Sequence, residues 1–388
     1  MRKKQSHKVR VDFRKNRSER TRNNNLTRDY GAETFDEDSQ TSGERISGKG
    51  DVSRRRTVIA EQVTKSGTFT NSGALLPSVD ESACLAGRVI SVHGLNSVVE
   101  CEDGRMFQCT TRRILKTLST EQRHVVIAGD RVLFRDAHQK QRLEGVIVRI
   151  EPRSSVLCRT SKHRKHVIAA NVDRVIVVAS AAEPDFKPNL IDRMLLTAEQ
   201  SGLVPVIVIN KMDLVDIAKF IPTVGHYSQM GYNILLVSVK TGLGIERLRR
   251  IMRGKENVVV GQSGVGKSSL LNAIDPALGL RIGNIGTAGK GTHTTTTAEL
   301  IRLGDGGYVV DTPGLRQFTL WDVIPEEICG LFRDLRSYEH CCRFPDCTHR
   351  HEEGCAIKNA IADGILDLRR YESYLTLFEE MADNQTVK

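Results

Sequence analysis

The stretch N-V-V-V-G-Q-S-G-V-G-K-S-S, residues 257–269, decides the fold expected for this 388-residue chain. Three β-branched residues at 258–260 predict a short buried strand, and the apolar spacing over residues 268–274 predicts a helix. Between them lies the pattern G-x-x-x-x-G-K-S, which begins at Gly261. Such a loop curls backbone N–H groups around phosphate oxygens, at a helix end whose partial positive charge favours an anion. The stretch therefore predicts a phosphate loop.

The phosphate loop also predicts roles for particular side chains. Lys267 is expected to reach the β- and γ-phosphates of a nucleotide, and Ser268 to bind Mg²⁺. An ordinary glycine-rich turn is the alternative, which the strand before the motif and the helix after it disfavour. The residues expected to bind the nucleotide here are Gly261, Gln262, Ser263, Gly264, Val265, Gly266, Lys267, Ser268 and Ser269.

Strands and helices alternate in the region before this loop, which predicts a parallel sheet. Residues 172–180 and 204–209 predict buried strands, with an amphipathic helix over 190–200 between them. The second strand leads into Asn210, Lys211, Met212 and Asp213. An amide and a carboxylate at this spacing can read the edge of guanine, because adenine lacks the N–H donors and would leave the carboxylate unpaired. A third strand over 233–237 leads to Ser238, Val239 and Lys240, in a loop of the type that closes over guanine.

Two segments after the phosphate loop are expected to complete a magnesium site. Residues 289–297 are rich in Gly and Thr and are typical of a mobile switch, in which a Thr hydroxyl joins the Mg²⁺ shell. Spacing does not rank Thr294, Thr295 and Thr296, and Thr295 is taken as the candidate. Asp311 ends a predicted strand and suits the role of holding Mg²⁺ through water.

The positive charge is concentrated at the N-terminus. Residues 1–30 contain eleven Lys and Arg against three Asp and Glu, a net +8 of the total +10. Residues 1–80 have few aromatics and no sustained period, which predicts a disordered basic tail. A solvated tail without a specific role is one interpretation. Because Arg and Lys alternate with Asn, we favour an arm that follows a nucleic-acid backbone.

The chain is expected to be a cytoplasmic protein. It contains no run of eighteen apolar residues, so we expect no membrane span. The N-terminus has no apolar secretion segment, and Asp12, Glu19 and Asp29 argue against an organelle transit peptide. No heptad pattern or long apolar face suggests an oligomer, so a monomer is expected.

Short β segments separated by turns predict a small closed barrel of the OB-fold type over residues 84–152. Arg112, Arg113 and Lys116 could line an RNA-binding face, since the OB-fold commonly reads RNA. A barrel that serves only as a packing module is the alternative. The five segments are residues 87–93, 97–101, 106–109, 130–134 and 144–150.

Five of the nine cysteines fall between Cys329 and Cys355, and such clustering in a cytosolic chain indicates a metal. Three thiolates and one imidazole would close a tetrahedral structural Zn²⁺ site with no position open for catalysis. Cys341 and His351 are competing ligands. Residues 324–338 and 356–381 on either side predict helices. The pattern is Cys342-x₄-Cys347-x-His349-x₅-Cys355.

The order of these motifs is unusual. In ordinary GTPases the phosphate loop precedes the guanine-reading motif, whereas here Asn210 precedes Gly261 by fifty-one positions. This order, with a barrel in front and a Cys/His cluster behind, resembles the RsgA (YjeQ) family of circularly permuted, ribosome-small-subunit-dependent GTPases. The resemblance covers the chain from about Cys84 to its C-terminus.

The resemblance implies a multidomain protein. An OB-fold β-barrel would span residues 84–152, a central α/β circularly permuted P-loop GTPase domain 165–320, and a C-terminal helical zinc-binding domain 321–388. It implies GTP and GDP as ligands, Mg²⁺ with GTP, and one structural Zn²⁺. It also implies a function in late maturation of the small ribosomal subunit, with the subunit and its rRNA as partners. GTP hydrolysis would be stimulated by the subunit and coupled to release of the protein from it. The zinc set that keeps the family spacing is Cys342, Cys347, His349 and Cys355.

The hydrolytic step lacks one familiar group. Small GTPases carry Gln directly after Asp-x-x-Gly, where this chain has Leu315, so intrinsic hydrolysis should be slow. The resemblance implies that His293 orients the attacking water once the subunit orders the switch, and imidazole is chemically suited to this. An exposed loop histidine without a role is the alternative. Two other functions remain open, an ATP-dependent P-loop enzyme and an RNA-binding module with a vestigial nucleotide site.

Overall fold

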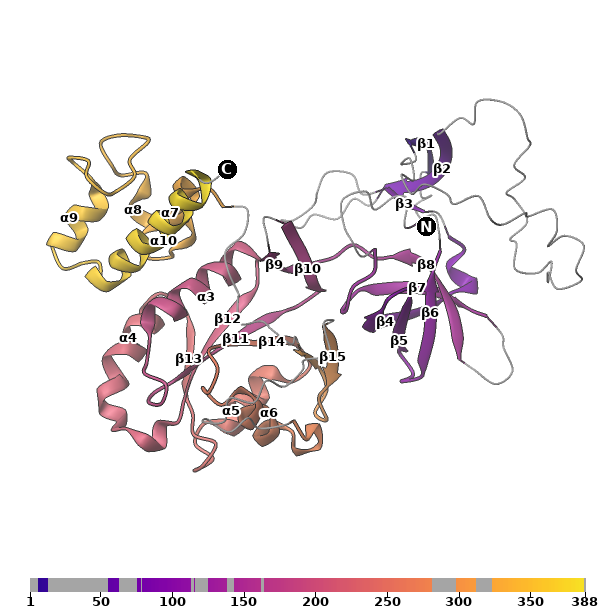
Figure 1. Ribbon diagram of the computed structural model, residues 1–388, viewed down its shortest axis with the longest axis horizontal. Helices are drawn as coiled ribbons and strands as arrows, with labels where there is room; N and C mark the ends of the chain where they lie inside the picture. Colours follow the sequence, from indigo (N-terminus) through magenta and orange to yellow (C-terminus); the bar gives the residue numbers. More distant parts are fainter. Residues whose placement is uncertain are drawn as a thin grey trace, which may run out of the picture.

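The computed structural model describes residues 6–12, 55–62, 75–77, 79–112, 115, 125–137, 143–161, 164–280, 298–311 and 323–386. Figure 1 shows a central α/β domain, with a β-barrel on one side and a helical domain on the other. Among the described residues, no helix combines the length and apolar character that crossing a membrane requires.

The barrel consists of five strands in the order β4-β5-β6-β8-β7, and a β7–β4 pairing closes it. β6 and β8 pair in parallel, while the other neighbours are antiparallel. Its core includes the fully buried Val89, Val99, Phe107, Phe134 and Ile147. This is the predicted OB-fold barrel, and the five expected segments are confirmed as strands. Their bounds are β4 (Leu85–His93), β5 (Asn96–Cys101), β6 (Met106–Thr111), β7 (Arg131–Asp136) and β8 (Glu144–Ile150).

The central sheet has the order β13-β12-β11-β14-β16-β15, and its first five strands are parallel as predicted. Helices α3 and α4 cover one face through Leu195 and Tyr227, and α5 and α6 cover the other through Leu248 and Leu270. The strands are β11 (Arg174–Ser180), β12 (Val204–Asn210), β13 (Asn233–Leu236), β14 (Glu256–Val260), β15 (Glu299–Arg302) and β16 (Tyr308–Asp311). The helices are α3 (Pro188–Gln200), α4 (Ile221–Gln229), α5 (Ile245–Met252) and α6 (Lys267–Ile274).

Two strand pairs were missed by the sequence analysis. β15 runs antiparallel to β16 at the sheet edge, and Glu299 of β15 also pairs with Ser91 of β4. The barrel and the central sheet therefore form one continuous hydrogen-bonded sheet. The hairpin of β9 (Val156–Ser161) and β10 (Arg164–Ala170) lies between the two domains in sequence.

The helical domain begins with a 3-10 helix at Pro325–Glu327 and continues through α7 (Ile328–Leu331), α8 (Arg336–Glu339), α9 (Ala356–Ala362) and α10 (Leu368–Thr386). The helices predicted over 324–338 and 356–381 are confirmed, but each segment is divided into shorter helices. Phe332 has extended backbone and ends α7, where its fully buried ring joins the core. Gly364 takes a left-handed φ of +71° in the turn between α9 and α10, where a helix cannot continue.

The N-terminal segment also differs from expectation. Residues 1–80 were predicted to be disordered, but the structure places three antiparallel strands there, β1 (Ser6–Asp12), β2 (Arg55–Gln62) and β3 (Leu75–Pro77). Both β1 and β2 contain β-branched residues, which favour extended backbone. The prediction is corrected for these strands, and most of the rest of residues 1–80 lies outside the described residues.

Candidate nucleotide-binding site and metal centre

The predicted phosphate loop connects β14 to α6, as the sequence analysis expected. Gly261, Gly264 and Gly266 have φ values of +151°, +84° and +92°, which other residues rarely adopt. A Cβ atom on Gly261 would lie 2.2 Å from the carbonyl oxygen of Val178 on the neighbouring strand. Glycine is therefore required at Gly261 both for backbone conformation and for this close approach.

Lys267 is the first residue of α6 and its side chain lies across the loop. Its Nζ donates to the carbonyl oxygens of Gly261 at 2.8 Å and Gln262 at 2.7 Å. The ammonium is thus held over the loop that is expected to receive phosphates. Phosphate oxygens, being charged, would be stronger acceptors for it than these carbonyls.

Asn210 connects the predicted guanine-reading motif to the phosphate loop. It ends β12, is 2% exposed, and its Nδ2 donates to the carbonyl oxygen of Val265 at 2.9 Å. A Cβ on Gly266 would lie 2.5 Å from that Nδ2, so only glycine, which has no side chain, fits at this position. Asn210 Oδ1 is buried without a hydrogen-bond partner in the described part of the chain. Such an orphaned acceptor fits a site that is completed by a ligand.

Asp213 and Ser238 come from adjacent strand ends and contact each other. Ser238 Oγ donates to Asp213 Oδ1 at 2.6 Å and accepts from the backbone N–H of Thr241 at 3.2 Å. The Ser238 hydrogen bond holds the pKa of Asp213 below its ordinary value. Asp213 therefore stays ionised and can accept hydrogen bonds. Recognition of the N–H groups of guanine requires such an acceptor.

The remaining residues of these two loops lie beside that contact. Lys211 has a left-handed φ of +62°, and its Nζ donates to the carbonyl oxygen of Glu183. Met212 is buried, while Val239 is half-buried and Lys240 is exposed. In a parallel sheet the carboxyl ends of neighbouring strands meet at one edge. The register of β13, β12, β11 and β14 accordingly brings the two loops and the phosphate loop together.

Several predicted residues cannot be placed. His293, Thr294, Thr295, Thr296 and Leu315 lie outside the described residues, as do Arg113 and Lys116. Asp311 is described through its backbone, as the last residue of β16, next to β14.

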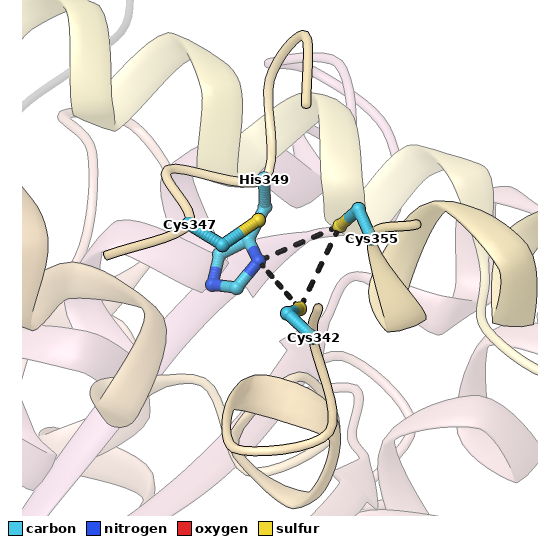
Figure 2. Close-up of side chains that lie close together, drawn as sticks. All are labelled: Cys342, Cys347, His349 and Cys355. Carbon is cyan, nitrogen blue, oxygen red and sulfur yellow. Dashed lines mark hydrogen bonds between the residues drawn. The ribbon is translucent and has the colours of Figure 1, made fainter. Parts of the chain in front are cut away.

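The four predicted zinc ligands come together in the helical domain (Figure 2). Their ligand atoms, the sulfurs of Cys342, Cys347 and Cys355 and a nitrogen of His349, all lie within 4.8 Å of one another. The Nδ1 of His349 is 3.4 Å from the Cys342 sulfur and 3.5 Å from that of Cys355, which are 3.9 Å apart. A tetrahedral Zn²⁺ with bonds of about 2.3 Å needs ligands about 3.7 Å apart, so the donor set fits.

The two competing ligands are not part of this cluster. The thiol of Cys341 is exposed and points to the carbonyl oxygen of Ser337, and His351 is exposed. Burial raises the pKa of Cys347 to about 12, so a thiolate there calls for a cation.

The loop that carries His349 is held by groups that the sequence analysis missed. The Glu352 carboxylate accepts hydrogen bonds from the Thr348 hydroxyl and from the backbone N–H groups of Thr348, Arg350 and His351. Burial alone raises the pKa of Glu352, but these hydrogen bonds lower it to about 2. Tyr371 and Tyr374 of α10 donate to the carbonyl oxygens of His349 and Thr348 at 2.6 and 2.7 Å. A glutamate three residues before the last cysteine is the only sequence signal for this support.

Comparison with known proteins agrees with this geometry. A protein-family model described as RsgA GTPase matches residues 150–321. The chain is 38% identical over 306 residues to small ribosomal subunit biogenesis GTPase RsgA 1 of Vibrio vulnificus strain YJ016, covering 77% of this chain and 84% of that protein. It is 39% identical over 307 residues to the RsgA of Chlorobaculum parvum, covering 76% and 98% respectively.

Two solved structures are similar over most of their length. YjeQ from Thermotoga maritima aligns with a TM-score of 0.65 at 36% identity, over 77% of this chain and 99% of that one. YloQ, described as a circularly permuted GTPase, aligns with a TM-score of 0.61 at 30% identity, over 78% and 96%. The permuted motif order agrees with the description of YloQ, and the chain belongs to the RsgA family of GTPases.

Proposed function

We propose that this protein is a GTP hydrolase that acts in late maturation of the small ribosomal subunit and is released when GTP is hydrolysed. The 2.9 Å hydrogen bond from Asn210 to Val265 is the main support for nucleotide binding, because it joins the guanine-reading motif to the phosphate loop. The curated relatives named small ribosomal subunit biogenesis GTPase support the choice of partner.

The nucleotide is assigned to three loops at one edge of the sheet. Asp213 reads guanine, the loop after Ser238 closes over the base, and the backbone of residues 261–269 holds the phosphates with Lys267. Ser268 and Asp311, with Thr295 as the switch candidate, are the residues that would hold Mg²⁺. Bound with GTP, Mg²⁺ supplies positive charge to the phosphate oxygens during transfer.

The other parts of the chain are assigned to binding the subunit. The chain is divided into a basic tail at 1–80, a barrel at 84–152, a GTPase domain at 165–320 and a helical domain at 321–388. The barrel and the helical domain would bind rRNA, and Zn²⁺ would hold the loop of the helical domain through Cys342, Cys347, His349 and Cys355. We further propose a cytoplasmic monomer with no membrane partner.

Slow hydrolysis by the free protein is part of the proposal. Leu315 cannot polarise water, so another group must orient the nucleophile. We assign this role to His293 of this chain when the protein is bound to the subunit, because an imidazole can accept a proton from water.

The test is the rate of GTP and ATP hydrolysis with and without purified small ribosomal subunits. A slow, GTP-only rate that rises strongly with subunits supports the proposal, and Lys267→Ala should abolish it while zinc stays bound. Equal use of ATP would favour another P-loop enzyme. No nucleotide turnover with subunit binding intact would favour the RNA-binding module with a vestigial site.

A further inference from the structure

One buried carboxylate of the barrel accepts hydrogen bonds from the GTPase domain. Glu100, on β5 of the barrel, is only 5% exposed. Its Oε1 accepts from Arg302 Nη1 at 2.7 Å and its Oε2 accepts from the Tyr308 hydroxyl at 2.7 Å. Both donors belong to the β15–β16 hairpin of the GTPase domain. The hydrogen bonds to Glu100 therefore cross the boundary between the two domains.

The same place is also contacted by Arg88 of β4. Its guanidinium binds Glu256 at 2.5 Å and lies over the Tyr308 ring, 4.9 Å from the ring centre. Glu256 and Tyr308 are directly paired, as the first residues of β14 and β16. The barrel thus holds the starting ends of two adjacent parallel strands.

The other ends of these two strands lie at the nucleotide site. β14 leads directly into the phosphate loop at Gly261, and β16 ends at Asp311, the proposed Mg²⁺ ligand. Tyr308 and Asp311 are three residues apart on an extended strand, a distance of about 10 Å. Because packed strands are stiff, a shift of Tyr308 is passed to Asp311 rather than absorbed between them.

We propose that Glu100 is a positioning residue of the GTPase site, which acts through Tyr308 and β16 to set the place of Asp311. This inference rests on the proposed function and adds to it a route from the barrel to the magnesium site. RNA that binds the barrel and shifts β5 moves Glu100, and with it the starting end of β16. By linkage, Mg²⁺ and GTP at the site then favour one placement of the barrel.

The test compares Glu100→Ala with Glu100→Gln, with Tyr308→Phe, and with Glu102→Ala as a matched control on the exposed turn after β5. Glutamine can pair with both Arg302 and Tyr308, because the tyrosine hydroxyl also accepts a hydrogen bond. Alanine cannot. Tyr308→Phe removes one hydroxyl from the GTPase side and leaves the barrel unchanged. All four are made in the full chain with zinc bound.

Three quantities are measured for each variant. The first is the Mg²⁺ concentration for half-maximal GTP hydrolysis, the second is the rate ratio with and without small subunits, and the third is the GDP affinity in EDTA. Coupling networks of this kind change an equilibrium by about 2- to 30-fold. Glu100→Ala should raise the Mg²⁺ requirement and lower the rate ratio within that range, Tyr308→Phe should do so less, and Glu100→Gln should restore most of both.

The GDP affinity without Mg²⁺ separates positioning from loss of structure. It should stay unchanged in all variants, since Glu100 contacts only Arg302 and Tyr308 among the strand residues described above, whereas β14, which leads into the phosphate loop, is held by Arg88 through Glu256. An unchanged Mg²⁺ requirement in Glu100→Ala overturns the inference, as does a parallel loss of GDP affinity or an equal effect of Glu102→Ala. If subunits fail to stimulate the wild type, the proposed function fails, while the Mg²⁺ requirement still decides the role of Glu100.

Discussion

The GTPase domain has two neighbours, and the two junctions are built differently. The helical domain docks on α3 through a charge network whose central residues, Arg370 and Asp192, are both 0% exposed. The barrel docks on β14, β15 and β16 through pairs that reach the surface, since Arg302 is 64% and Arg88 is 21% exposed. The first junction is closed to water and the second is partly open to it.

The closed junction resembles a domain core. Arg370 Nη1 lies 2.6 Å from Asp192 Oδ1, and Nε and Nη2 each donate to Asp334 at 3.0 Å. The hydroxyls of Tyr227 and Ser373 donate to the two oxygens of Asp192 at 2.8 Å. The core cluster of the helical domain includes the buried Leu196, which belongs to α3. We infer that the helical and GTPase domains move as one body.

The closed junction holds the helical domain in place, whereas the open junction can adjust the nucleotide site. The helical domain contacts helices α3 and α4, whereas the barrel contacts strands that lead directly into the nucleotide loops. A half-exposed junction stores little free energy, so a partner on the barrel can shift it at little cost.

The largest effect is expected from loss of the metal. Cys342→Ser should abolish zinc binding and lower the unfolding free energy of the helical domain by several kcal/mol, because binding free energy at such a site is folding free energy. Cys341→Ser is the matched control, since its thiol is exposed outside the cluster. Zinc content by mass spectrometry and unfolding by calorimetry check both. Equal zinc loss in the two variants would mean that the ligand set is wrong.

Breaking the closed junction should come next. Arg370→Ala leaves Asp192 and Asp334 without their buried cation, and we expect a loss of about 3–5 kcal/mol. Urea unfolding measures it, with Arg250→Ala as the control, because the Arg250 side chain is 76% exposed and should matter little. A loss below about 1 kcal/mol in Arg370→Ala would contradict the closed-junction interpretation.

The support of the zinc loop should have a smaller effect. Glu352→Gln removes the charge that accepts four hydrogen bonds from Thr348, Arg350 and His351. Zinc affinity should fall about 10-fold at neutral pH, as for other partners of ligating residues. Competition with a coloured chelator measures this, and Glu353→Gln at the exposed neighbouring position is the control. The same zinc affinity in both variants would mean that Glu352 does not support zinc binding.

The smallest effect on stability is expected at the open junction. Arg302→Met should lower the free energy of unfolding by only about 1–2 kcal/mol, because Arg302 is 64% exposed and Tyr308 still donates to the buried Glu100. Arg250→Met, at a 76% exposed position on α5 away from the barrel, is the matched control in the same urea titration. A loss as large as that of Arg370→Ala would erase the contrast between the junctions.

The sequence by itself determined the parts of this protein whose signals are local. Alternation with turn residues predicted the barrel strands, and spacing of glycines, amide and carboxylate predicted the nucleotide loops. The order of Asn210 and Gly261 predicted the permutation, and the Cys/His cluster, with the spacing of the family that the chain resembles, predicted the ligands that the structure brings together. Each of these motifs lies within one short stretch of sequence, and the permutation follows from the order in which two such stretches occur.

Only the tertiary structure decided which distant segments meet. The pairs of Asn210 with Val265, of Asp192 with Arg370 and of Glu100 with Tyr308 span 55 to 208 positions, and no local pattern encodes such partners. The helix break at Phe332 has the same origin, because burial of its ring in the domain core outweighs the helical spacing around it. Local preference is a weak guide wherever a side chain gains more from a distant core than from its neighbours in sequence.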